Sequence, residues 1–136
     1  MYDAGRTVAG PDDPRLGDID VVLVSHMHGD HVGDRHIPAV NAGDCAAPDF
    51  SVGAVPNTNS VNIALAKGAT IVTGSEMPKF FAAKLKALGG SAEQSQLVRF
   101  GASRSINGVT LTTVPAAHSN GIAGAMIGST LGTLLS

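Results

Sequence analysis

The sequence predicts a layered α/β domain with a mixed sheet. Two short runs rich in β-branched residues, 19–24 and 69–73, lie between polar segments, a pattern typical of buried strands. Segments with helix-capping residues and apolar side chains at helical spacing lie between and after these runs. Asn107-Gly108 predicts a hairpin turn. Strands that alternate with helices and also include a hairpin favour a mixed sheet over an all-parallel one.

The first part of the chain is expected to hold one complete strand and a long loop. Residues 2–5 (Tyr-Asp-Ala-Gly) are typical of a strand end that breaks into a loop. Residues 19–24 form the first buried strand, and 33–57 are rich in Gly, Pro, Asn and Asp, as loops are. A loop of this length inside a compact domain tends to be functional or disordered.

Two helices with a strand between them are expected next. The first helix spans 60–67, with Ser60 as its cap and Gly68 as its stop, and the strand 69–73 follows. The second helix is packed on the sheet through one apolar face. Ser75 is its expected cap, and Glu76 and Pro78 lie in its first turn. The apolar face consists of Met77, Phe81, Leu85 and Leu88, and Gly89-Gly90 ends the helix.

The last expected elements lead to a histidine. Residues 97–100 are a candidate strand, and 105–109 form a hairpin that turns on Asn-Gly. The strand 109–115 then delivers Ala-Ala-His, so that His118 lies directly after a strand end.

Composition limits the class of protein. The chain has 136 residues, 43% of them hydrophobic, which suits one domain. Nine Lys and Arg against eleven Asp and Glu give a net charge of -2, so we expect neither a nucleic-acid nor a membrane partner. The single cysteine, Cys45, excludes an internal disulfide. A cytoplasmic location is the default expectation, although one free thiol does not exclude the periplasm.

The two ends of the chain show no targeting or spanning pattern. Residues 1–6 lack the basic and apolar regions of a signal peptide and have the character of an internal start. Residues 121–136 carry no charge, but a spanning helix needs about 20 apolar residues. We therefore interpret 121–136 as a glycine-rich loop or as a core segment without its partner.

The segment that carries chemistry follows the first buried strand directly. It contains His26, His28, Asp30 and His31 within six residues. Imidazole nitrogens and carboxylate oxygens are natural ligands of zinc and similar divalent ions. Residues two apart at a fraying strand end can point the same way, so His26 and His28 can converge on one metal ion. The alternative is a solvated histidine-rich loop, which needs neither this crowding nor this position.

The pattern His26-x-His28-x-Asp30-His31 resembles the signature of the metallo-β-lactamase superfamily, and the resemblance covers about residues 2–121. It implies half of an αββα sandwich, with helices on one face of the sheet, and a single partial domain over 1–136. It further implies that the chain is truncated and lacks the C-terminal half.

The resemblance also implies a ligand set. His26, His28 and His118 would hold a first metal ion, and Asp30 and His31 would belong to a second site. Asp30 would in addition orient the attacking water, and Asp34 would support the ligands from close by. The expected cofactor is Zn²⁺, one or two ions, with Mn²⁺ or Fe²⁺ as alternatives.

The implied activity is metal-assisted hydrolysis of a small molecule that is a lactam, lactone, thioester or phosphodiester. The family's second site also uses a later bridging Asp and a final His, yet no Asp, Glu or His follows His118. Two alternatives therefore stay open. The chain is a metal-binding fragment without catalysis, or it is a half-domain that becomes active as a homo-oligomer.

Overall fold

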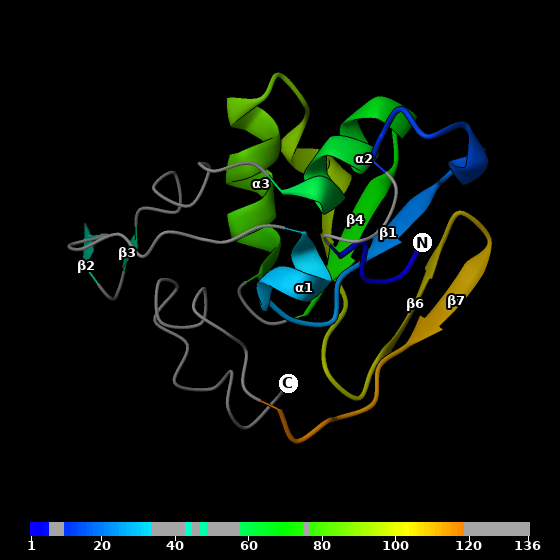
Figure 1. Ribbon diagram of the computed structural model, residues 1–136. Helices are drawn as coiled ribbons and strands as arrows, with labels where there is room; N and C mark the ends of the chain where they lie inside the picture. The colour runs from blue at the N-terminus through cyan, green and yellow to red at the C-terminus, as the bar shows by residue number, and fades with distance from the viewer. Residues whose placement is uncertain (6–9, 34–42, 45–46, 49–57, 75–76, 119–136) are drawn as a thin grey trace.

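A three-stranded parallel sheet forms the centre of the fold (Figure 1). The computed structural model describes residues 1–5, 10–33, 43–44, 47–48, 58–74 and 77–118. The strands of the sheet are β1 (Val21–Leu23), β4 (Thr70–Thr73) and β5 (Ser95–Leu97), in the order β1-β4-β5. Helices α2 (Asn59–Lys67) and α3 (Met77–Ala87) connect them. This arrangement confirms the predicted α/β class.

Antiparallel pairing occurs in two separate hairpins. One joins β6 (Ser103–Ile106) to β7 (Val109–Thr112), and the other joins β2 (Gly43–Asp44) to β3 (Ala47–Pro48). The predicted Asn-Gly turn is confirmed, because Asn107 and Gly108 have positive φ values of 49° and 79°. The remaining elements are short, namely α1 (Gly29–Val32), η1 (Pro14–Leu16) and η3 (Ala92–Gln94).

Residues 1–3 extend the sheet beyond β1. Tyr2 makes a parallel bridge to Leu23, and the Asp3 amide donates to the Leu23 carbonyl at 2.8 Å. The interpretation of residues 2–5 as a strand end therefore agrees with the structure. Its consequence is that Asp3 lies beside the residues that follow β1.

The two faces of the sheet have different coverings (Figure 1). Val22, Val24 and Ile71 belong to the larger core, which α2 and α3 complete. The alternate residues form a smaller cluster with the β6–β7 hairpin, made of Val72, Val98 and Ile106 and the adjoining Val21, Leu23 and Leu111. Alternation of side chains along a strand explains this division. Both helices thus lie on one face, as expected.

The predicted cap of helix α2 was wrong. Its cap is Thr58, whose hydroxyl accepts from the Val61 amide at 3.1 Å, and not Ser60. The buried Ser60 hydroxyl donates instead to the Val32 carbonyl at 2.9 Å, and so ties α2 to α1. Gly68 ends the helix in the left-handed region at φ 64°, as predicted.

Helix α3 follows the predicted apolar face for most of its length. Met77, Phe81 and Leu85 are buried, whereas Leu88 lies beyond the last helical residue and is 42% exposed. Phe80 and Lys84 are buried as well, so the covered face is wider than predicted. Ser75, the expected cap, and Glu76, expected in the first turn, lie outside the described residues.

Boundaries differ from prediction at the end of the described chain. The third strand of the sheet spans Ser95–Leu97 where 97–100 was expected, and β7 ends at Thr112 where 115 was expected. Asp34, most of the 33–57 loop and all of 121–136 lie outside the described residues. In the described part of the chain, no helix has the length and apolar character needed to cross a bilayer.

Candidate metal centre

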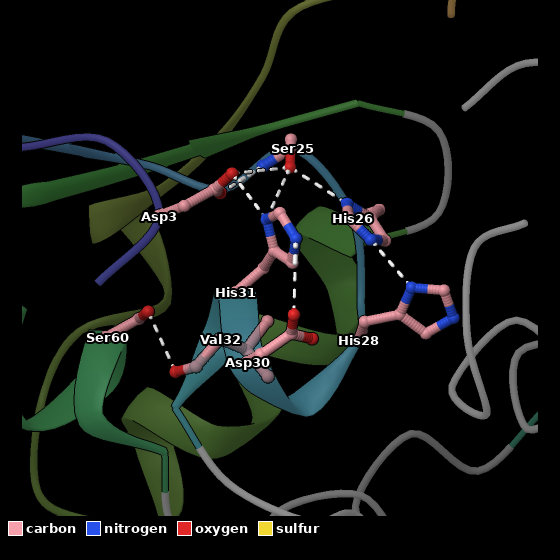
Figure 2. A network of polar contacts seen from close by, with 8 residues as sticks. All are labelled: Asp3, Ser25, His26, His28, Asp30, His31, Val32 and Ser60. Carbon is pink, nitrogen blue, oxygen red and sulfur yellow. Dashed lines mark hydrogen bonds and ion pairs between the residues drawn. The ribbon is translucent and has the colours of Figure 1, made fainter. Parts of the chain in front are cut away.

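The histidine-rich segment begins where β1 ends. His26 follows the strand after two residues, and His28 precedes the single turn of α1 (Figure 2). Gly33 ends that turn in the left-handed region at φ 99°, and its amide donates to the Gly29 carbonyl. Ligands of α/β folds usually bind at the carboxyl ends of parallel strands. The segment lies at this edge of the sheet.

Two neighbouring histidines and a third from a distant part of the chain meet at this edge. One ligand atom from each of His26, His28 and His118 can be chosen so that all three lie within 4.8 Å of one another. The centroid of the His26 ring lies 4.6 Å from that of His28 and 4.3 Å from that of His118. His118 reaches the cluster from the segment after β7. We call these three residues the histidine cluster.

The members of the cluster differ in burial. His26 is only 5% exposed, His28 is half-buried and His118 is exposed, so the cluster opens to solvent on one side. Burial lowers the pKa of His26 to about 4, and the charges of His31, His118 and His28 act in the same direction. His26 is therefore neutral at pH 7, the state in which an imidazole binds a metal ion.

Asp30 and His31 lie beside the cluster on α1. The His31 ring centroid is 4.0 Å from that of His26, and the Asp30 Oδ2 is 3.7 Å from the His31 Nε2. The Asp30 side chain is 76% exposed, so its carboxylate is open to solvent. These two residues are outside the group of three whose ligand atoms all lie within 4.8 Å. Asp30 and His31 thus lie next to the histidine cluster and are not part of it.

Asp3 and Ser25 are polar partners that the sequence analysis did not identify (Figure 2). The Asp3 carboxylate accepts from the Ser25 amide at 2.8 Å and from the Ser25 hydroxyl at 2.7 Å. Its Oδ2 also lies 2.7 Å from the His31 Nδ1. Ser25 Oγ lies 2.9 Å from the His26 Nδ1. The signal available in the sequence was a carboxylate within residues 2–5, a segment typical of a strand end.

Close backbone packing holds this region in place. A Cβ on Gly5 would lie 1.9 Å from the Asp30 carbonyl oxygen, so only glycine allows this approach. A Cβ on Gly33 would lie 2.4 Å from the Asn59 Cβ. The Asn59 side-chain Nδ2 also donates to the Ala4 carbonyl at 3.0 Å. The N-terminal segment, α1 and the start of α2 therefore form one tightly packed unit behind the histidines.

A cavity of about 510 Å³ lies on the hairpin side of the sheet, and its described lining residues do not include the three histidines of the cluster. Its wall includes Ser25, which contacts His26, and Ala116, which is two residues before His118. No charged side chain is among its described lining residues, and apolar groups such as Leu23, Phe100 and Val114 predominate. This volume is within the range of about 300–1,000 Å³ typical of small-molecule sites.

The donor set fits a divalent transition metal. Three neutral imidazoles with an open side are a known catalytic zinc arrangement, in which the fourth position takes water or substrate. Comparisons of the chain with protein-family models, with curated proteins and with solved structures found no match.

Proposed function

We propose that this chain is the metal-binding part of a metal-dependent hydrolase of the metallo-β-lactamase superfamily. The observation that carries the proposal is the convergence of His26, His28 and His118 at the carboxyl end of β1. His118 is 90 positions from His28 in the sequence, so their proximity is a product of the fold. A solvated surface loop offers no reason for a third, distant histidine to join the other two.

Zinc is the metal we propose for the histidine cluster, with Mn²⁺ or Fe²⁺ as alternatives. Imidazole is a preferred ligand of zinc, and the low pKa of His26 keeps one ligand deprotonated at neutral pH. Asp30 and His31 would supply two ligands of a second site. Asp34, proposed as a nearby support, follows Gly33 directly in the chain.

A metal ion in this site would supply Lewis acidity and would lower the pKa of a coordinated water towards about 7. The chain's own residues then have two tasks. Asp30, with its carboxylate open to solvent beside His31, would orient the attacking water and accept its proton. The three imidazoles would leave one side of the cluster open, where the electrophilic carbon or phosphorus of the substrate would approach.

The cavity supports a small-molecule substrate. Its uncharged, mainly apolar wall favours a substrate whose non-reacting part is also uncharged. The wall includes Ser25, whose Oγ lies 2.9 Å from the His26 Nδ1, so this residue connects the cavity with the histidine cluster.

Metal content and hydrolysis together test the proposal. The purified chain would be dialysed against trace zinc and measured by elemental analysis, and then assayed with 4-nitrophenyl acetate and with γ-butyrolactone. About one zinc per chain and a rate that chelation abolishes are expected. A folded chain without metal would refute the proposal. A metal-bound chain inactive on both substrates would favour the alternative of a metal-binding fragment.

Replacing His118 with Ala is expected to weaken zinc binding without abolishing it, because His26 and His28 remain. The loss should exceed the roughly 10–100-fold cost of removing an outer partner of a metal ligand. Competition with a chromogenic zinc chelator measures the affinity. An exposed residue close by, Ala117, provides the control as Ala117→Ser, which should leave the affinity unchanged. Equal zinc affinities of the original chain, His118→Ala and Ala117→Ser would show that His118 is not a ligand.

A second candidate is a half-domain that is active as a homo-oligomer. Apolar side chains that line the cavity are also exposed, among them Tyr2 at 66% and Val114 at 77%. Burial of such a surface in a second copy is favourable. Light scattering across a concentration series should then show a dimer, and Val114→Asp should convert it to a monomer with reduced activity. A chain that stays monomeric at all concentrations would contradict this candidate.

A further inference from the structure

We propose that the cavity between the β6–β7 hairpin and the parallel sheet binds an uncharged aromatic or aliphatic group, and that Phe100 makes it favour a flat ring. The assignment of that group to the substrate of a hydrolase rests on the proposed function. Binding of the group itself needs no metal ion, because the described lining residues of the cavity do not include the three histidines of the cluster.

The cavity continues the smaller core towards the carboxyl ends of the strands. Val72, with the adjoining Leu23 and Leu111, belongs to that core, and all three also line the cavity. An apolar group held there would be in contact with the sheet on one side and with the hairpin on the other. Removal of such surface from water favours binding. Each strand of the sheet also contributes a lining residue beyond its end, namely Ser25 after β1, Gly74 after β4 and Phe100 after β5.

The wall offers a ligand mainly apolar surface. No charged side chain is among the described lining residues. The hydroxyl groups of three lining residues already have partners: that of Ser25 donates to Asp3, that of Thr113 donates to the Arg99 carbonyl, and that of Thr112 pairs with that of Ser103. A sugar or a phosphate would lose hydrogen bonds to water in this cavity without full replacement, which is costly. The wall therefore selects a group that has no charge and few polar atoms.

A short turn holds Phe100 in the wall. The Ala102 amide donates to the Arg99 carbonyl at 3.0 Å, and Gly101 has a positive φ of 71°, which suits the third position of such a turn. A Cβ on Gly74 would lie 2.9 Å from the Phe100 Cζ, so the ring rests directly on the backbone at the end of β4. Phe100 is half-buried. Because aromatic rings attract one another beyond the effect of buried area alone, Phe100 favours a ligand with a flat ring.

The cavity and the histidine cluster lie at the same edge of the sheet. Ser25 lines the cavity, and its Oγ is 2.9 Å from the His26 Nδ1. In the proposed hydrolase, the group in the cavity is therefore the non-reacting part of the substrate. The substrate class is then a compound with an uncharged aryl or alkyl substituent, and sugars and nucleotides are excluded.

Fluorescence titration of the metal-free chain with N-phenyl-1-naphthylamine, an uncharged aromatic probe, tests the binding site. We expect saturable binding of about one probe per chain, from which 2-naphthol displaces the probe and glucose does not. The anion 2-naphthoate has the same ring system as 2-naphthol and should compete about tenfold more weakly, or worse, because its charge would be buried in an apolar wall. Absence of saturable binding, or equal competition by 2-naphthol and 2-naphthoate, would overturn the proposal.

Two neighbouring alanines locate the bound probe. Ala116 is exposed and lines the cavity, so Ala116→Phe should obstruct it and weaken probe binding by about fivefold or more. Ala117 is exposed and is not among the described lining residues, so Ala117→Phe is the matched control and should bind the probe as the original chain does. Equal probe affinities of these two variants would overturn the proposal. Probe affinity that falls as the chain concentration rises would show that a second copy covers the cavity, and would overturn it as well.

Phe100→Ala tests the preference for a flat ring. Loss of the aromatic contact should weaken the probe by about 2–10-fold. Binding of cyclohexanol, measured by its competition with the probe, should change less. Equal losses for both ligands would remove Phe100 from the proposal. If Phe100→Ala does not fold, the relative affinities of 2-naphthol and cyclohexanol for the original chain decide, and a weaker affinity for 2-naphthol would count against Phe100.

The zinc-loaded chain separates this inference from the proposed function. Relative to the non-enzymatic rates, kcat/KM should be about 15-fold higher for 4-nitrophenyl butyrate than for 4-nitrophenyl acetate, because each buried methylene contributes about fourfold. Ala116→Phe should reduce this preference, and Ala117→Phe should keep it. Probe binding by a chain that neither binds zinc nor hydrolyses esters would support the cavity site and refute the proposed function. Hydrolysis with no preference for the longer ester would overturn the assignment of the bound group to the substrate.

Discussion

Simultaneous replacement of His26 and His28 by Ala is expected to lower the zinc content of the dialysed chain from about one ion to none. The reason is that two of the three ligands in the histidine cluster are lost, including the buried one. The remaining ligand of the cluster, His118, is exposed and offers a single imidazole, which cannot retain an ion through dialysis. Elemental analysis of the variant and the original chain, treated in parallel, measures the effect.

The control is His36→Ala, because His36 is the one histidine among the five in the chain that belongs to neither proposed metal site. This variant should keep its full zinc content. Zinc should also raise the thermal stability of the original chain, by about 4 kcal/mol at a thousandfold excess over its dissociation constant, and this gain should vanish in the double variant. Unchanged zinc content in the double variant would leave the proposed function without its basis.

The second large effect is expected from Gly33→Ala, which should reduce the free energy of unfolding by about 2–5 kcal/mol. Gly33 has φ 99°, and a non-glycine residue in the left-handed region costs about 1–2 kcal/mol. Its new Cβ would lie 2.4 Å from the Asn59 Cβ and 3.1 Å from the Ala4 carbonyl oxygen, and overpacking typically costs about 1–3 kcal/mol more. Urea denaturation of the metal-free chain measures the loss.

Gly68→Ala separates the two contributions to this loss. Gly68 also has a positive φ, 64°, but a Cβ there would meet nothing within 4 Å. Its substitution should therefore cost only the backbone term. Equal losses at the two positions would show that the contact between α1 and α2 does not depend on close packing at Gly33. A larger loss at Gly33, together with weaker zinc binding, would link that packing to the metal site.

The sequence predicts the elements that depend on local chemistry. The Asn107-Gly108 turn and the Gly68 helix stop have the expected conformations because each needs a positive φ that few residues adopt. The cap of α2 was wrong because Thr58 and Ser60 are both suitable hydroxyl residues at nearly the same place. Only the tertiary contact of Ser60 with the Val32 carbonyl decides between them. The predicted ends of two strands were also wrong by a few residues, because tertiary contacts decide where a strand ends.

In the candidate site, too, the sequence predicts what depends on neighbouring residues and misses a contact between distant ones. The spacing of His26, His28, Asp30 and His31 is readable because they are neighbours in the chain, and the structure places them at one end of β1. Resemblance to a family suggested His118, which the structure brings to the first two histidines. Asp3 was missed because its partners are 22 and 28 positions away. Only the pairing of Tyr2 with Leu23 makes them adjacent.

Because His28 and His118 are far apart along the chain, a bound ion would also act as a crosslink. An ion held by both would close a loop of 90 residues, from the end of the first strand to the segment beyond the last hairpin. Closing a loop of that length lowers the conformational entropy of the unfolded chain, which stabilises the folded state by about 4.6 kcal/mol in the chain-entropy model used for disulfides. A chain that cannot form an internal disulfide would thus gain a reversible crosslink, one that a chelator opens and zinc restores.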